Sequence, residues 1–216
     1  MKIKKVLIVW IILMMAIGYS QKMENLPTAE EVWAGVDAKL SGLQDYTSSF
    51  KAEAGSRDLF IKFHGKIFCR LPDKVKFVLE GLPDFLSKHS EIINENSVSQ
   101  IIQRDKFNHR LIGQEKIEDK TYYILQSTAK DTGNNLVEAL FWINPQNYTS
   151  DKIILKYKDG GYIKVLQEYQ LIEGFPLPVS QKIKLMFPLW RAEIRVYFSD
   201  FKINPGLGKD FFVKQK

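Results

Sequence analysis

The chain has 216 residues, of which 45% are hydrophobic and 26% are charged, and its formal net charge is +6. This composition suits a folded protein with a substantial core. The sequence has no dense Lys/Arg block and no basic segment interleaved with aromatics, which argues against a nucleic-acid partner. Cys69 is the single cysteine, so the chain cannot form an internal disulfide. It lies two residues after Ile67, on the same face of a predicted strand, and is expected to be a small buried hydrophobic residue.

The first twenty residues predict a secretory signal peptide. A basic start, MKIKK, precedes an almost wholly apolar run at residues 6–19, and Gly18 and Ser20 have the small side chains and spacing that signal peptidase accepts. The run is shorter than the roughly 20 residues of a membrane-spanning helix, although a retained anchor is the alternative. Cleavage near Ser20 removes three lysines and no acid, which lowers the net charge from +6 to +3. Residues 21–216 are then expected to form one extracytoplasmic domain.

One amphipathic helix is predicted at the start of this domain. Thr28 can cap the helix, and Glu31, three residues later, completes a capping box. The apolar stripe that follows predicts a helix of about fifteen residues; it consists of Val32, Trp33, Val36, Leu40 and Leu43.

Nearly everything after this helix predicts antiparallel strands joined by short polar turns. The strongest hairpin signal is Asp159-Gly160-Gly161, whereas residues 174–178 predict a loop and residues 84–90 a short helix or lid. Strand-like segments lie at residues 46–53, 59–70, 75–79, 91–94, 98–104, 108–117, 121–128, 137–143, 152–158, 162–171, 181–187 and 191–201.

The resulting fold class is mainly β (α+β), with about ten to eleven strands. Such a run of antiparallel strands closes into a barrel or bends into a strongly curved sheet, because a flat open sheet leaves long edges that pair with other chains. A single helix cannot cover a sheet this wide. The concave side is therefore expected to be partly open unless side chains fill it.

Alternation within the strands predicts which side chains face that concave side. The segment 59–70 has apolar residues at one parity and Lys62, His64, Lys66 and Arg70 at the other. The expected lining of a cavity is Trp33, Val36, Phe50, Leu59, Ile61, Phe63, Ile67, Val75, Phe77 and Leu79. The alternative is that this face is an ordinary core that holds no ligand.

Catalytic and metal-binding patterns are weak throughout, and we expect no enzyme, no cofactor and no metal. No GxSxG, HExxH, CxxC or P-loop motif occurs, and the three histidines are scattered. His64 is expected at the surface, and His109 needs no special role. A lipid-modifying enzyme would become the better hypothesis if His109, Asp105 and Ser99 converged.

The apolar run at residues 185–190 ends in Pro188-Leu189-Trp190 and allows two interpretations. It is either an ordinary strand end with a buried Trp190, or an exposed hydrophobic contact at the mouth of a cavity, which a membrane or a partner could touch.

The order of these features resembles the LolA-like family of periplasmic outer-membrane lipoprotein carriers. A helix and a strand ending in SSFKAEA precede GKIFCRLPDKVKF, which resembles the family's glycine, alternating strand, proline and following strand. LIGQEKIEDKTYYILQSTAK is similar to its glycine-led hairpin, and residues 141–185 resemble its long C-terminal run. The resemblance covers nearly the whole mature chain and depends on no single motif.

The resemblance implies an incomplete, strongly curved antiparallel barrel with an N-terminal helix, short lid helices and an apolar cavity for acyl chains. It implies a monomeric periplasmic carrier that shuttles acylated lipoproteins or other lipids from the inner to the outer membrane. The implied partners are an inner-membrane ATP-driven lipoprotein-releasing complex and an outer-membrane receptor. The alternative function is that of an envelope lipid-sensing regulatory protein of the same fold.

The possible lid or gate residues are Arg70, Phe85 and Leu86. In the LolA-like family an arginine directly precedes the strand-ending proline and is thought to hold the lid shut, whereas here Leu71 precedes Pro72. A shift of one residue moves a strand side chain to the opposite face. Either a bulge near Gly65 or at the strand end restores the direction of Arg70, or this protein gates differently.

Overall fold

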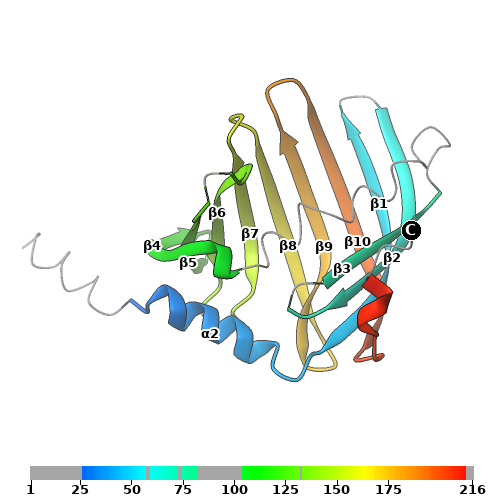
Figure 1. The fold of residues 1–216 in the computed structure, drawn as a ribbon, viewed down its shortest axis with the longest axis horizontal. Helices are drawn as coiled ribbons and strands as arrows, with labels where there is room; N and C mark the ends of the chain where they lie inside the picture. The colour runs from blue at the N-terminus through cyan, green and yellow to red at the C-terminus, as the bar shows by residue number, and fades with distance from the viewer. Residues whose placement is uncertain (1–25, 57–58, 73, 82–103, 132, 213–216) are drawn as a thin grey trace, which may run out of the picture.

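In the part of the chain that the structure describes, ten strands form one broad, strongly curved antiparallel sheet (Figure 1). The computed structural model describes residues 26–56, 59–72, 74–81, 104–131 and 133–212. The strand order is β3-β2-β1-β10-β9-β8-β7-β6-β5-β4, so the first strands pair with the last one. The sheet does not close, which confirms the predicted incomplete barrel.

The strands follow the predicted order along the chain. Their bounds are β1 Asp45–Ser56, β2 Leu59–Arg70, β3 Lys74–Glu80, β4 Phe107–Ile117, β5 Lys120–Ala129, β6 Leu136–Ile143, β7 Ser150–Tyr157, β8 Tyr162–Ile172, β9 Phe175–Met186 and β10 Arg191–Ile203. The 3-10 helices are η2 Arg104–Lys106 and η3 Lys209–Phe212. Arg104 was predicted in a strand, which is wrong, and the predicted segments 84–90, 91–94 and 98–103 lie outside the described residues.

The helix α2, Ala29–Lys39, begins as the sequence predicted. The backbone N–H of Glu31 donates to the Thr28 hydroxyl, and the N–H of Thr28 donates to the Glu31 carboxylate, at 3.1 and 2.7 Å. The helix has 11 residues rather than about fifteen, since its C-cap is Leu40. Leu40 and Leu43 still face the interior, but they do so from the turn that leads into β1.

The strand β9 begins earlier than predicted, because the expected loop at residues 174–178 is mostly strand. Proline lacks the N–H that a ladder needs, so it is confined to edges and bulges. Here Pro176 and Pro178 pair only with β8, while the pairing of β9 with β10 starts at Ser180. This stretch is therefore locally an edge and tolerates both prolines.

Irregular registers bend the sheet. Pairing shifts between Thr47 and Ser49 against β10, between Leu111 and Gly113 against β5, and between Glu168 and Tyr169 against β9. Bulges of this kind increase strand twist and bend the bulged strand. The two arms of the sheet consequently curve toward the same side, and they enclose a concave face.

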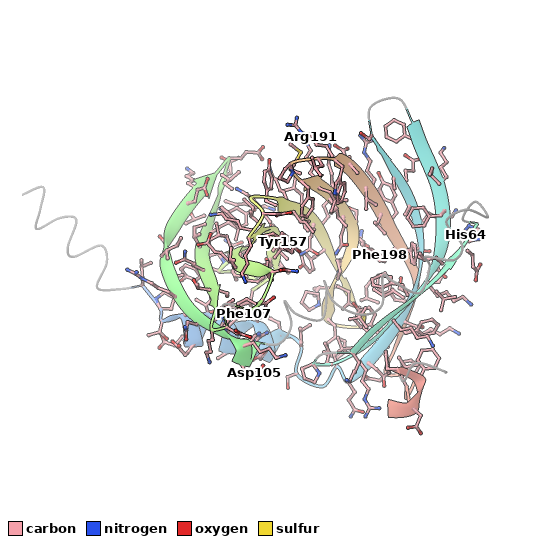
Figure 2. The ribbon with its side chains drawn as sticks, turned by 45° about the horizontal axis from the view of Figure 1, so that its top comes forward. His64, Asp105, Phe107, Tyr157, Arg191 and Phe198 are labelled. Atoms are coloured by element: carbon pink, nitrogen blue, oxygen red, sulfur yellow. The ribbon has the colours of Figure 1, made fainter. Side chains whose placement is uncertain are left out.

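The helix covers only one arm of that concave face. Val32 of α2 is fully buried against a cluster from β4 to β7 that includes Phe107, Leu125 and Phe141. A second cluster, around Phe50 and Ile67 in the other arm, has no helical member. Figure 2 shows this division, with Phe107 in the arm that carries α2 and Phe198 in the other arm. Within the described residues, no helix is long and apolar enough to cross a membrane.

Candidate binding cavity

Strand pairing aligns apolar side chains across the arm formed by β1, β2, β3 and β10. Phe50 of β1 pairs with Gly65 on one side and with Phe198 on the other, and Ala52 lies between Phe63 and Val196. Since alternate residues share a face, these pairs place their side chains together on the concave side. The same face continues into β3 with Val75, Phe77 and Leu79.

Gly65 creates the space for the central aromatic ring of this arm. A Cβ atom at Gly65 would lie 2.0 Å from the backbone oxygen of Val78 and 3.0 Å from Cζ of Phe50. The Phe50 ring instead occupies this position and meets Phe63 and Phe77 edge-on, with ring centroids 6.3 Å apart in both pairs. The glycine therefore allows both the close approach of β3 and the packing of three phenylalanines.

Two adjoining cavities occupy the concave face. The larger has a volume of about 1140 Å³ and lies beside α2, with Trp33, Val36, Phe141 and Ile153 in its wall. The smaller has a volume of about 420 Å³, and the aromatic arm lines it together with Ile183 and Ile194 from β9 and β10. Both cavities share Arg70, Leu71, Pro72 and Gln167. The two cavities therefore adjoin each other, and together they extend from α2 to β3.

The residues predicted to line a cavity divide between these two spaces. Trp33 and Val36 line the larger one. Phe50, Phe63, Ile67, Val75, Phe77 and Leu79 line the smaller one. Ile61, which pairs with Ala54, lines neither cavity. The side chain of Leu59 lies outside the described part of the chain, and so do the possible gate residues Phe85 and Leu86.

A polar bridge crosses the concave wall where the cavities meet, and the sequence reasoning missed it. The side-chain amide of Gln167 donates to the Ser150 carbonyl at 2.9 Å and to the Tyr169 hydroxyl at 3.0 Å, and it accepts from Gln181 at 2.6 Å. Burial raises the pKa of Tyr169, so its hydroxyl keeps its proton. A bound molecule therefore meets neutral hydrogen-bonding groups here, not charges.

The thiol of Cys69 is buried in the smaller cavity, as the sequence predicted. Burial raises its pKa to about 12, although a hydrogen bond with Tyr46 works in the opposite direction. Burial also raises the pKa of Tyr46. A thiol that stays protonated is a poor nucleophile, so this pair belongs to the apolar wall.

Arg70 does not point into the aromatic arm. The pairing of β2 with β1 and with β3 is regular along its whole length, so the bulge that would have reoriented Arg70 is not present at Gly65 or at the strand end. Its guanidinium Nη1 instead donates to the carbonyl of Leu207 at 2.7 Å. Arg70 thereby holds the segment after β10 at the wall of the larger cavity, which Leu207 lines.

Asp45 holds the same segment from the other side. Its carboxylate is buried and accepts from the backbone N–H groups of Gly206 and Leu207 at 3.1 and 2.9 Å. The side-chain oxygen of Asn204 accepts hydrogen bonds from the backbone N–H groups of Gln44 and Asp45. We call Asp45, Arg70, Asn204, Gly206 and Leu207 the C-terminal clasp.

A polar cluster lies beside α2, where Trp33, Asp37 and Arg104 line the larger cavity. Arg104 lies over the Trp33 ring at 4.1 Å and donates to both carboxylate oxygens of Asp37 at 2.8 and 2.9 Å. His109 is half-buried with its Nε2 2.9 Å from the Arg104 carbonyl and its Nδ1 2.7 Å from the Ser127 hydroxyl. Because a carbonyl only accepts, Nε2 carries a proton in this arrangement. His109 thus has a structural partner that the sequence did not indicate.

The other candidate chemistry remains dispersed. His64 is exposed, as predicted, and lies 3.4 Å from Glu80 on the neighbouring strand. Asp105 is exposed and Ser99 lies outside the described residues. Within the described part of the chain, no group of three or more His, Cys, Asp or Glu side chains is placed to hold a metal.

Comparison with known proteins identifies both a sequence family and a fold. A family model described as "Uncharacterized protein" matches residues 90–216. A search among curated proteins finds no match.

Three solved structures share the fold. A Vibrio parahaemolyticus domain named for outer-membrane lipoprotein sorting has a TM-score of 0.65 at 11% identity and covers 84% of this chain and 94% of its own. A LolA superfamily protein from Nitrosomonas europaea has a TM-score of 0.63 at 15% identity and covers 88% and 99%. A DUF1329 family protein from Desulfovibrio piger has a TM-score of 0.61 at 14% identity and covers 84% and 97%. These matches confirm the LolA-like fold.

Proposed function

This chain belongs to the family of uncharacterized proteins whose model matches residues 90–216, and from its LolA-like fold and concave cavities we propose that it is a lipid carrier. It binds the acyl chains of lipoproteins or of other lipids and shuttles them across the periplasm from the inner to the outer membrane. By resemblance, its partners are an ATP-driven inner-membrane releasing complex and an outer-membrane receptor.

The observation that carries this proposal is the mismatch between the apolar face and its cover. The helix α2 packs on one arm of the sheet, whereas the aromatic arm of β1, β2, β3 and β10 faces a cavity of about 420 Å³ that adjoins one of about 1140 Å³. Burying one methylene contributes about 0.8 kcal/mol. A chain that buries ten methylenes gains roughly 8 kcal/mol, less the cost of ordering it.

The polar bridge fits a ligand with a polar linkage between its hydrocarbon chains. Gln167 lines both cavities and Gln181 lines the smaller one, and both place neutral amides in a largely apolar wall. Ester and amide groups of an acylated molecule are neutral hydrogen-bonding partners of the same kind. Chains extending to both sides would occupy both cavities.

The direct test is binding of an environment-sensitive fluorescent fatty acid to the protein. We expect fluorescence to rise on binding and a triacylated lipopeptide to displace the probe at micromolar concentration. Phe63→Asp is expected to abolish binding, and Lys62→Asp, one residue away on the opposite face, is expected to preserve it. A lack of displacement by the lipopeptide overturns the carrier proposal.

Binding alone does not separate a carrier from a lipid-sensing regulator of the same fold. A carrier transfers a labelled lipopeptide from donor to acceptor vesicles faster than the lipopeptide moves without protein. Binding without accelerated transfer would favour the regulator.

A further inference from the structure

The β9–β10 hairpin ends in an apolar tip that the proposed cavity does not use. β9 ends at Met186 and β10 begins at Arg191, so residues 187–190, Phe-Pro-Leu-Trp, form the connection. Leu189 is 96% exposed and Trp190 is 52% exposed. Single exposed apolar residues are common, but two adjacent ones on a protruding tip mark an interaction site.

Backbone hydrogen bonds and ring contacts stabilise the tip in the conformation that exposes Leu189. The N–H of Phe187 donates to the Trp190 carbonyl at 3.0 Å, and the N–H of Trp190 donates back at 3.3 Å. The two rings stack with centroids 4.8 Å apart and an interplanar angle of 13°. Phe187 also packs on Tyr157 at 5.5 Å and lies so close to Gly161 that a Cβ atom there would be 2.2 Å away. The neighbouring β7–β8 hairpin therefore packs against the tip through Tyr157 and Gly161.

Basic side chains of β9 and β10 lie near the tip, and the carboxylate of Asp159 lies on its β7–β8 side. Arg191 is exposed at the first position of β10, and Figure 2 shows it at the rim of the sheet. On the outer face just below, Glu193 is bound by three cations, Lys182, Lys184 and Arg195, at 3.4, 3.9 and 3.1 Å. Three positive charges share one carboxylate there, which leaves an excess of positive charge beside the apolar tip.

The tip belongs to a larger edge of the molecule. The hairpin ends of β1–β2, β7–β8 and β9–β10 all lie at the end of the sheet opposite α2 (Figure 1). Phe60 and Tyr162 are also exposed near these hairpin ends. Several exposed aromatic and aliphatic side chains therefore lie along this edge.

We propose that the β9–β10 tip docks the protein on a lipid bilayer that carries anionic headgroups, with Leu189 and Trp190 inserted at the interface. Tryptophan favours the headgroup level of a bilayer, and nearby Arg and Lys side chains attract anionic lipids. A stable protein interface buries about 800 Å² on each partner and involves roughly 20–30 residues a side. A narrow convex tip supplies far less contact, whereas a bilayer needs no complementary pocket.

Docking in this way would bring the smaller cavity close to the membrane. Ile194 lines that cavity and lies four residues after Trp190 on β10, which is about 13 Å along a strand. This link to the cavity depends on the proposed carrier function, whereas membrane docking by the tip does not.

The test is flotation of the full chain with vesicles made of equal parts phosphatidylglycerol and phosphatidylethanolamine. We expect Leu189→Ser to lower the partition coefficient about tenfold, the effect of removing one inserted leucine, and Leu189→Ser/Trp190→Ser to lower it further. Leu171→Ser is the matched control, because Leu171 is 74% exposed at the opposite end of the sheet, and it should leave partitioning unchanged. The N-terminal apolar segment is common to all variants and cancels in the comparison.

Three outcomes would overturn the proposal. The first is equal partitioning of Leu189→Ser and the parent protein. The second is partitioning that is as strong on phosphatidylcholine vesicles and insensitive to salt, which would remove the role of the basic residues. The third is loss of binding to a protein partner without any change in vesicle binding. Probe binding in the cavity should be the same in Leu189→Ser, so failure of docking and failure of the carrier function are distinguishable.

Discussion

The side-chain amide of Gln181 donates a hydrogen bond to Gln167 across β8 and β9, with 2.6 Å between Nε2 and Oε1. The two residues are direct partners in the strand register, and they project from the concave face where the two cavities meet. Gln167 uses its own amide group on Ser150 and Tyr169. One side chain thus organises the polar part of an otherwise apolar wall.

Gln167→Met is expected to destabilise the fold by about 1 kcal/mol, because it leaves half-buried hydrogen-bonding groups without their partner. Urea unfolding followed by circular dichroism measures the change. Gln170→Met on the same strand is the control, since Gln170 is exposed, and it should stay within roughly 0.5 kcal/mol of the parent. Equal stability of both variants would show that the bridge contributes little to the fold.

Phe77→Asp is expected to lower the affinity for a fluorescent fatty acid by more than about tenfold, because it places a carboxylate in an apolar wall. Val78→Asp is the matched control. Val78 is the next residue of β3, is 37% exposed and faces the opposite side, so its affinity should match that of the parent. Similar losses in both variants would mean that the aromatic arm is not the binding face. Thermal unfolding of each variant establishes that both remain folded.

Gly65→Ala is expected to destabilise the protein by about 1–3 kcal/mol, the usual cost of overpacking. The added methyl group would lie 2.0 Å from the backbone oxygen of Val78, and backbone cannot move aside as a flexible side chain can. Gly208→Ala, where nothing lies within 4 Å of the new Cβ atom, should be nearly neutral. Differential scanning calorimetry of the two variants compares them. An unchanged melting temperature for Gly65→Ala would contradict the close approach of β3.

Much of the fold was predictable because strand alternation is a local signal. The parity of residues 59–70 placed Phe63, Ile67 and Cys69 on one face, and the register of β2 confirms that face. The start of α2 was equally local, since Thr28 and Glu31 are three residues apart. The end of α2 was not predictable in this way. Leu40 and Leu43 keep the apolar spacing of the helix although they lie in the turn that follows it.

Long-range pairing explains what the sequence did not reveal about the candidate site. β1 pairs with β10, so Val196 and Phe198 join the cavity although they lie 144 and 148 residues after their partners Ala52 and Phe50. Pro176 and Pro178 predicted a loop, because prolines are rare inside a sheet. No local signal shows that β10 does not pair with this stretch of β9, which lets the strand hold both prolines. The sequence does contain one signal for the polar bridge. Gln167 falls on the same face of its strand as Ile163 and Val165, and a polar residue on an otherwise apolar face often marks a binding site.

Arg70→Ala is expected to loosen the C-terminal clasp without unfolding the sheet. The Arg70 guanidinium donates to the Leu207 carbonyl, and Asp45 holds the N–H groups of Gly206 and Leu207. Hydrogen exchange at residues 204–208 should become at least about tenfold faster, since local opening there requires the loss of fewer hydrogen bonds. Arg70→Lys should show a smaller effect, because an ammonium group can still donate to the Leu207 carbonyl although it lacks the fixed planar geometry of the guanidinium group. Lys66→Ala on the same face of β2 is the control.

If Arg70 also gates the cavity, its loss changes ligand kinetics. Arg70 lines the rim of both cavities, so a looser clasp should speed dissociation of the fluorescent fatty acid measured by stopped flow. Faster hydrogen exchange with unchanged dissociation would assign Arg70 to stability alone. Faster dissociation with unchanged exchange would place its effect at the rim and not in the clasp.

Cys69 predicts the direction of a pH effect on stability. Burial raises the pKa of its thiol from 9.0 to about 12 in the folded protein, so the folded state holds a proton that the unfolded chain releases earlier. The corresponding stability is fully present below pH 9 and is lost as the pH rises toward 12.

Cys69→Ala removes this contribution, so the free energy of unfolding of the variant should fall less between pH 8 and pH 10.5 than that of the parent protein. Urea unfolding at both pH values measures the difference. Burial raises the pKa of Tyr46, and Cys69 adds to that rise, so the difference between the two proteins reports on the Cys69–Tyr46 pair. Parallel losses in the two proteins would mean that the Cys69 thiol is accessible to water and that the smaller cavity is wetter than its apolar lining implies.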